Sequence, residues 1–314
     1  MTRWWRVIGA LVGLVVLGWT ARGQPGAECG KGSVDKAFWQ GIKNGNYSVP
    51  SGQNADALAR VLVGCLASPD PELRDALGYE VFSRWIRGGV ISNAGLRELA
   101  NTLGANLKLG IGEQGTDSVF LRSFSALVLS EVLRQDARGA ILEMPQLRTT
   151  LEAGIAYLQT ERDLRGFDDR LGYIHGVAHG SDVLWRLALN PRVTAADLER
   201  ILGAIAGKVA PDGTHAYTFN ESDRLARAAA YAIAREVIPQ EKLNAWLEGI
   251  AAPAPLSGWG EAFSSQAGLT KLHNTKAFLR ALHSFLYLGG ENAKYIEDFL
   301  PNLEKALETM AGLV

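Results

Sequence analysis

The chain has 314 residues, of which 47% are hydrophobic and 21% are charged. This composition is typical of a folded globular protein and excludes a disordered one, and the length suits one large domain or two modest ones. The formal net charge is −1. A chain without a basic excess is not expected to bind nucleic acid.

The first 23 residues have the three parts of a secretory signal. Arg3 and Arg6 supply a positive start, residues 7–21 form an apolar run without a charge, and Ala21-Arg22-Gly23 places small residues where a signal peptidase reads them. We expect cleavage after Gly23, export to the periplasm or the extracellular space, and no stable membrane span afterwards. The alternative is an uncleaved N-terminal membrane anchor, although the apolar run is shorter than the ~20 residues of a typical span.

The only two cysteines, Cys29 and Cys65, both follow the expected cleavage site. In an oxidising compartment an even pair indicates one disulfide, which ties the N-terminal segment to a helix. Two buried free thiols are the alternative.

Helix signals then recur to the end of the chain. Caps, prolines and glycines predict helices over 68–89, 92–110, 116–133, 145–161, 172–189, 194–209, 221–237 and 240–250. Residues 251–260 are rich in Pro and Gly and read as a linker, before two more helices over 261–288 and 291–312. We therefore expect one helical-repeat-like domain over 24–250, with a C-terminal helical pair at 251–314 packed on it.

The connections between these helices are short, as in antiparallel helix pairs. About a dozen helices joined in this way are too many for a simple bundle. The sequence predicts an all-α fold of stacked antiparallel helical hairpins, either a HEAT/armadillo-like solenoid or an α/α ring, with a concave face.

The densest polar segment is 161–186. On a helix that begins at 172, His175, His179, Asp182 and Arg186 fall within about 60° of one another. Two imidazoles one turn apart can ligate a divalent metal such as zinc, with Asp182 as a third ligand, and without a metal a His–Asp pair can act as a general base. The alternative is that these histidines are structural. Gly172, Gly176 and Gly180 indicate a neighbouring helix at close range.

A second group of charges lies around this segment. Arg122 is the only charge in an apolar helix, so it needs a carboxylate partner, for which Glu161, Asp163 and Asp182 are candidates. The ion pair of Arg122 is either structural or positions a substrate anion, which makes Arg122 a candidate ligand-binding residue. Glu161, Asp163 and Arg165 either grip a ligand at a groove mouth or tie two helices together.

The segment 220–228 adds Arg224 as a further candidate ligand-binding residue. In the same segment, Asp223 and Arg227 have the spacing of an ion pair within one helix.

The segments 67–86, 111–129, 161–184 (ERDLRGFDDRLGYIHGVAHGSDVL) and 221–228 resemble an uncharacterised bacterial family labelled domain of unknown function 2785. The resemblance covers residues 36–250 and implies a helical-repeat architecture without an established activity. Phe167 and Tyr173 depart from the pattern, which has Tyr-like and Trp-like residues there. The family-like positions are Asp70, Arg74, Asp75, Arg122, Ser123, Arg165, Gly166, His175, His179, Asp182, Glu221 and Arg224.

Two functions follow as hypotheses. One is a small-ligand binder or an enzyme centred on His175, His179 and Asp182, performing hydrolysis or acid/base elimination on a cell-envelope substrate. The other is a helical-repeat module that binds a protein or another cell-envelope partner without chemistry. Burial separates them, because polar residues that converge on an open pocket favour the first and residues sealed between helices favour the second.

Overall fold

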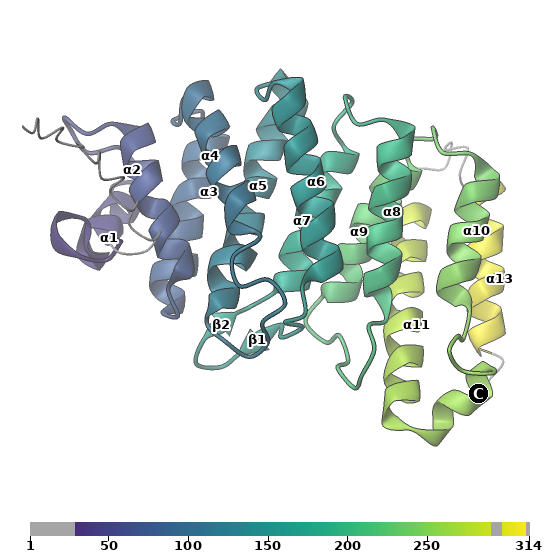
Figure 1. Ribbon diagram of the computed structural model, residues 1–314. Helices are drawn as coiled ribbons and strands as arrows, with labels where there is room; N and C mark the ends of the chain where they lie inside the picture. The colour runs from purple at the N-terminus through teal and green to yellow at the C-terminus, as the bar shows by residue number, and fades with distance from the viewer. Residues whose placement is uncertain (1–28, 290–296, 312–314) are drawn as a thin grey trace, which may run out of the picture.

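A computed structural model describes residues 29–289 and 297–311 of the chain. The predicted signal sequence at 1–23 lies outside these residues. The helices stand side by side in a row that runs from α1 (Lys36–Asn44) at one end to α10 and α13 at the other (Figure 1). The first and last described elements lie at opposite ends, so the described helices form an open row and not a closed ring.

The row has two layers, defined by which helices pack against each other. The first layer consists of α3 (Glu80–Arg87), α5 (Ser118–Gly139), α7 (Gly176–Ala188), α9 (Glu221–Ile233) and α11 (Gln266–Tyr287). The second layer consists of α2 (Ala55–Leu62), α4 (Asn93–Asn106), α6 (Met144–Thr160), α8 (Ala195–Val209), α10 (Gln240–Ala251) and α13 (Leu300–Ala311). Successive helices alternate between the layers along most of the chain, so each hairpin contributes one helix to each layer.

The all-α prediction is confirmed. In the described part of the chain the only strands are β1 (Phe167–Asp168) and β2 (Gly172–Tyr173), which pair as an antiparallel hairpin. The remaining short elements are η1 (Gly32–Val34), η2 (Val63–Ala67), η3 (Glu72–Tyr79) and η4 (Trp259–Ser264); η3 is a π-helix that continues into α3, and the others are 3-10 helices.

Neighbouring hairpins are joined by side-chain contacts with a regular sequence spacing. Arg97 donates to the Ile141 carbonyl at a separation of 44 residues, and Trp246 donates to the Leu202 carbonyl at the same separation. A repeat of about 45 residues lies in the range of HEAT and armadillo units. The assignment to either repeat type stays a prediction.

Helix starts follow from capping residues. Ser92 accepts a hydrogen bond from the Gly95 amide at 3.0 Å, as the sequence predicts for the start of α4. Thr194 and Asp197 form a reciprocal capping box at the start of α8. These caps satisfy the amide groups that the first turn of a helix leaves unpaired.

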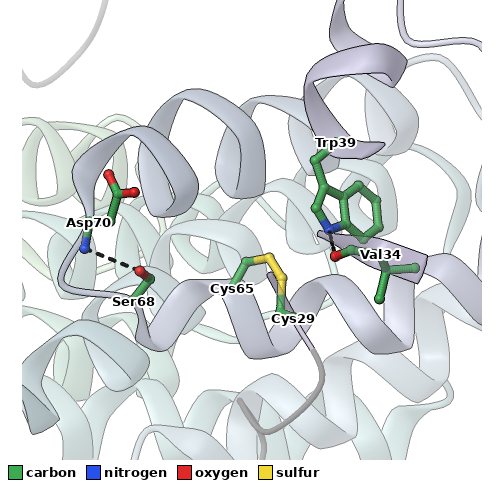
Figure 2. Close-up of a disulfide and its surroundings, with 6 residues drawn as sticks. All are labelled: Cys29, Val34, Trp39, Cys65, Ser68 and Asp70. Atoms are coloured by element: carbon green, nitrogen blue, oxygen red, sulfur yellow. Dashed lines mark hydrogen bonds between the residues drawn. A yellow bond between two sulfur atoms is a disulfide. The ribbon is translucent and has the colours of Figure 1, made fainter. Parts of the chain in front are cut away.

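The N-terminal end of the row is closed by the contacts that Figure 2 shows. A disulfide joins Cys29 to Cys65, whose Cα atoms are 5.2 Å apart. Beside it, Trp39 is fully buried and its Nε1 donates to the Val34 carbonyl at 3.1 Å. Ser68 accepts from the Asp70 amide at 3.1 Å, in the turn that leads to η3. The segment before α1 is thereby attached to η2.

At the other end of the row, α10 ends at Ala251, where the sequence predicts a linker, and η4 and α11 follow. Helix α11 packs on α9, and α13 packs on α10 and α11. No helix in the described ranges is long and apolar enough to cross a membrane.

Candidate functional site

A cavity of about 730 Å³ opens on the first layer, between η3, α3, α5, α7 and α9. Its volume is in the range of small-molecule sites. Seven of the side chains that line it are charged, namely Asp75, Arg87, Glu131, Asp182, Arg186, Arg224 and Arg227. Five are aromatic, namely Tyr79, Phe124, Tyr173, Trp185 and Phe219. His175, His179, Ser130, Thr218 and Asn220 are the other polar residues of the lining.

The start of α7 corrects the sequence analysis. The predicted helix over 172–189 begins only at Gly176, because Gly172 and Tyr173 form β2. His175 is the residue before the helix and adopts the left-handed conformation, with φ +49°. The Ile174 amide donates to the Gly166 carbonyl at 2.8 Å. The hairpin, and not the helix, therefore sets the direction of the His175 ring.

Arg74 anchors this hairpin from η3. Its side chain is fully buried, and Nη2 donates to the carbonyls of Leu171 at 2.7 Å and Tyr173 at 3.0 Å. The guanidinium lies over the rings of Phe120 and Phe124, at 4.2 and 4.6 Å from their centroids. A residue about 100 positions earlier in the chain thus fixes the segment that carries His175.

The tautomer of His179 follows from its neighbour on α5. Ser123 Oγ donates to the Ile174 carbonyl at 2.5 Å and lies 2.9 Å from His179 Nδ1. A hydroxyl has one hydrogen, so His179 Nδ1 must donate to Ser123. The Nε2 atom is then left with a free lone pair. Burial and the nearby His175 and Arg224 hold the pKa of His179 well below its usual value, which keeps the ring neutral.

His175 is fixed in the opposite tautomer. Its Nε2 lies 2.9 Å from the Phe219 carbonyl, which can only accept, so Nε2 carries the hydrogen and Nδ1 is the acceptor. Burial, reinforced by Arg224, lowers the pKa of His175 to about 4. The two rings meet edge to face, with centroids 5.6 Å apart.

Asp182 lies one turn further along α7 and is bound by two arginines of α9. Arg224 Nη1 donates to Oδ2, and Arg227 Nη2 donates to Oδ1 at 2.6 Å. Burial raises the pKa of the Asp182 carboxyl, while the two guanidiniums oppose that shift. The predicted pair between Asp223 and Arg227 is not formed, because Arg227 turns to Asp182 on the neighbouring helix.

Asp75 contributes a second carboxyl from η3. Burial raises its pKa to about 6, against the opposing effect of Arg74, whose Nε lies 2.6 Å from Oδ1. Near neutral pH the carboxyl of Asp75 can therefore still bind a proton, whereas the imidazoles of His175 and His179 are neutral. Such a combination can supply a proton donor and a proton acceptor.

The other predicted site residues do not line this cavity. Arg122 pairs with Glu161, and both side chains are fully buried. Asp163 accepts from the Gly115 amide at 3.0 Å and from Arg165, whose Nη2 also donates to the Thr116 carbonyl at 2.9 Å. Arg122, Glu161 and Asp163 are buried, whereas the side chain of Arg165 is partly exposed. Together the four residues tie the segment after α6 to α5 and to the loop before it.

The predicted metal set does not converge in the described part of the chain. Both oxygens of Asp182 accept from arginines. No group of three or more His, Cys, Asp and Glu residues lies in an arrangement suited to a metal ion among the residues that the structure describes. His175 and His179 keep one free nitrogen each, so the zinc site stays a prediction that the donor set does not support.

The model of the family described as "Protein of unknown function (DUF2785)" matches residues 107–284. This match spans more than half of the chain. The chain belongs to the DUF2785 family. The match begins later than the predicted 36–250 and extends further, so it includes α5, α7 and α9 but not η3, which carries Arg74 and Asp75. No curated protein and no solved structure matches the chain.

The DUF2785 match thus covers most of the cavity, including three residues that were not predicted as site residues from the sequence. These residues are Trp185, Arg186 and Arg227, which all line the cavity. The sequence spacing could have indicated Arg186, because it lies seven residues after His179 on the same helical face. For Arg227 the spacing was misleading, because it predicted an ion pair with Asp223 in the same helix.

Proposed function

We propose that this protein binds a small molecule in the cavity between η3, α5, α7 and α9. The observation that carries this proposal is the convergence of His175, His179, Asp182 and Arg224 on one open cavity from segments more than 40 residues apart. Buried polar groups destabilise a fold unless they are paired. A cavity that gathers so many of them therefore indicates a binding role and not a role in core packing.

The mouth of the cavity favours a ligand with a planar or apolar part. Tyr173 and Phe219 are 50% and 41% exposed, and adjacent exposed apolar side chains of this kind are typical of interaction sites. The neighbouring Phe167 ring lies 5.1 Å from Tyr173 and 6.2 Å from Phe219, centroid to centroid. We call these three residues the aromatic rim, and we assign them to stacking on the ligand.

The experiment is a binding screen by thermal shift and intrinsic fluorescence with a panel of neutral, anionic and cationic metabolites. A compound that binds the wild type should bind His179→Gln and Tyr173→Ala at least tenfold more weakly. Tyr287→Ala, an exposed aromatic on α11 outside the cavity, is the matched control and should bind normally. Equal affinity in all four proteins would place the ligand elsewhere and overturn the proposal.

One observation favours acid–base catalysis as a second candidate function. The neutral His179 ring keeps its Nε2 lone pair available, while Asp75 with a pKa of about 6 can hold a proton. If these two groups act as base and acid, kcat/KM for a turned-over ligand should fall as pH rises through about 6, because Asp75 loses its proton. Asp75→Asn should remove this limb, and a limb that persists unchanged would exclude Asp75 as the acid.

We also propose that the protein is exported. The N-terminal pattern at 1–23 and the Cys29–Cys65 disulfide support this, since disulfides persist mainly in oxidising compartments. Mass spectrometry of the protein from its native cells tests the proposal. A mature chain that begins at Gln24 is the expected result, and a chain that retains residues 1–23 would favour the membrane-anchor alternative.

A further inference from the structure

One end of the cavity holds an arginine without a partner. Three carboxylates and four guanidiniums line the cavity. Glu131 is bound by Arg87, with N–O distances of 2.7 and 2.5 Å, and Asp182 is shared by Arg224 and Arg227. Asp75 is paired with Arg74 from behind. Arg186 has no ion pair and no hydrogen bond to any residue in the described ranges.

Arg186 is instead stacked on Trp185. Its guanidinium carbon lies 3.6 Å from the centre of the Trp185 ring, and that of Arg227 lies 3.9 Å from the same ring. Two cations that share one aromatic ring repel each other, and a stack of this kind leaves the hydrogen-bonding edges of a guanidinium unused. Because the four guanidiniums of the lining outnumber its three carboxylates, and those carboxylates bind other arginines, the Arg186 end of the cavity has an excess of positive charge.

Unpaired donors gather at the same place. Trp185 Nε1, Arg186 Nε and Arg227 Nε are all buried without an acceptor. A buried donor left unpaired is costly, and three of them around one ring are unusual for a folded protein. Because no protein acceptor holds Arg186, its side chain can turn toward a ligand without breaking a hydrogen bond.

We propose that Arg186, Arg227 and Trp185 form a subsite for an oxyanion, the carboxylate or phosphate group of the ligand. The planar guanidinium of an arginine can donate to two oxygens of such a group. The anion also compensates the positive charge of the arginines that Asp182 and Glu131 do not neutralise. This inference rests on the proposed ligand binding and specifies the chemical class of that ligand.

The helix sets the distance between the two ends of the site. Arg186 follows His179 by seven residues on α7, which corresponds to about 10 Å along the helix axis. The ligand then carries its oxyanion at the Arg186 end and, about 10 Å away, a hydroxyl or amine that donates to His179 Nε2. A single small anion occupies only the first of these two positions.

The test uses inorganic phosphate, sulfate and acetate as probes, titrated into the full mature protein at constant ionic strength with chloride as the balancing ion. We expect saturable binding, followed by thermal shift and by the ¹⁵N–¹H signal of the Trp185 indole, which Trp185→Phe identifies. Tighter binding of phosphate and sulfate than acetate assigns a phosphate-like group, and the reverse order assigns a carboxylate.

Arg186→Gln should weaken this binding at least tenfold. Arg200→Gln is the matched control, because Arg200 lies on α8 in the second layer and pairs with Glu152. Arg186→Lys keeps the positive charge but loses the bidentate guanidinium, so it should bind the anion severalfold more weakly than the wild type. If Arg186→Gln does not fold, Arg186→Lys tests whether Arg186 binds the anion. Equal binding by the wild type and the Arg186 variants would overturn the subsite.

The outcomes also separate this inference from the function on which it rests. A neutral compound that binds the wild type and Arg186→Gln alike, while no anion binds, would overturn the oxyanion subsite and leave ligand binding intact. If no compound of any class binds the wild-type cavity, both proposals fail.

Discussion

Arg122 of α5 and Glu161 at the end of α6 form an ion pair from which solvent is fully excluded. Arg122 Nε lies 2.5 Å from Glu161 Oε2, and Nη2 lies 3.1 Å from Oε1. Glu161 also accepts from the amides of Arg162 and Asp163, both at 2.8 Å. The pair thereby determines how the chain leaves α6 on its way to the hairpin that carries His175.

Loss of one partner of this pair should be strongly destabilising. Glu161→Gln leaves the Arg122 charge buried without compensation, and we expect the free energy of unfolding to fall by about 3–5 kcal/mol in urea denaturation. Glu152→Gln, which breaks the exposed pair with Arg200, should cost at most about 1 kcal/mol. Similar losses in both variants would mean that the Arg122–Glu161 pair is not sealed from water.

The buried His175 should make the protein sensitive to acid. Its pKa is about 4 in the folded chain and 6.5 as an unperturbed group, so between these values the unfolded chain binds the extra proton. Stability is therefore lost as pH falls below 6.5. Asp75 acts in the opposite direction, because its raised pKa lets the folded chain bind a proton below about 6.

Comparison with His175→Asn isolates the histidine, because asparagine tolerates the left-handed backbone and does not titrate. Between pH 6.5 and pH 5, the wild type should lose about 1.5 kcal/mol more stability than this variant, since Asp75, Asp182 and Arg224 are common to both. Urea denaturation at the two pH values measures the difference. Parallel losses would show that His175 becomes protonated in the folded protein.

The tautomer of His179 should depend on Ser123. In the wild type we expect ¹⁵N spectra of the imidazole to show a protonated Nδ1 and an unprotonated Nε2. Ser123→Ala removes the acceptor for Nδ1–H, so both tautomers should appear and affinity for a cavity ligand should fall. Thr is the conservative replacement that should restore the wild-type pattern. A protonated Nε2 in the wild type would contradict the assignment.

The contact between α6 and α7 should tolerate no added side chain. A Cβ at Gly180 would lie 2.9 Å from Tyr157 Cε1, and Tyr157 is buried and donates to the Gly176 carbonyl. We expect Gly180→Ala to destabilise the fold by about 1–3 kcal/mol through overpacking. Gly203→Ala on α8 meets no atom within 4 Å and should stabilise the protein by up to about 1 kcal/mol. Thermal denaturation of both variants tests whether this contact is as tight as described.

The disulfide between Cys29 and Cys65 should contribute measurably to stability. It closes a segment of 36 residues, for which loop-closure entropy gives about 4 kcal/mol. The double variant Cys29→Ala/Cys65→Ala should lose stability of that order, and a reducing agent should lower the stability of the wild type without affecting the variant. A wild type that does not respond to reduction would show that the two thiols are free.

Much of the fold could be predicted from the sequence, because its signals are local. Capping residues such as Ser92, prolines at helix starts and glycines at helix ends depend only on nearby residues, so they predict an all-α chain with helices near their observed places. The sequence also singled out His175, His179 and Asp182, since their helical spacing is visible in the printed order, and it indicated Arg224 in the separate segment 220–228. It required a partner for Arg122, because an isolated buried charge is too costly.

Only the tertiary structure decided how these residues are used, because the deciding contacts join residues far apart in the chain. Arg74 holds the hairpin across about 100 residues, which moves His175 out of the helix and into the left-handed conformation. Arg227 of α9 binds Asp182 of α7. It therefore does not pair with Asp223, the partner that helical spacing predicted. Among the described residues Arg186 has no ion pair for the same reason. The nearby carboxylates of Glu131 and Asp182 bind other arginines, and no local pattern in the sequence predicts that choice.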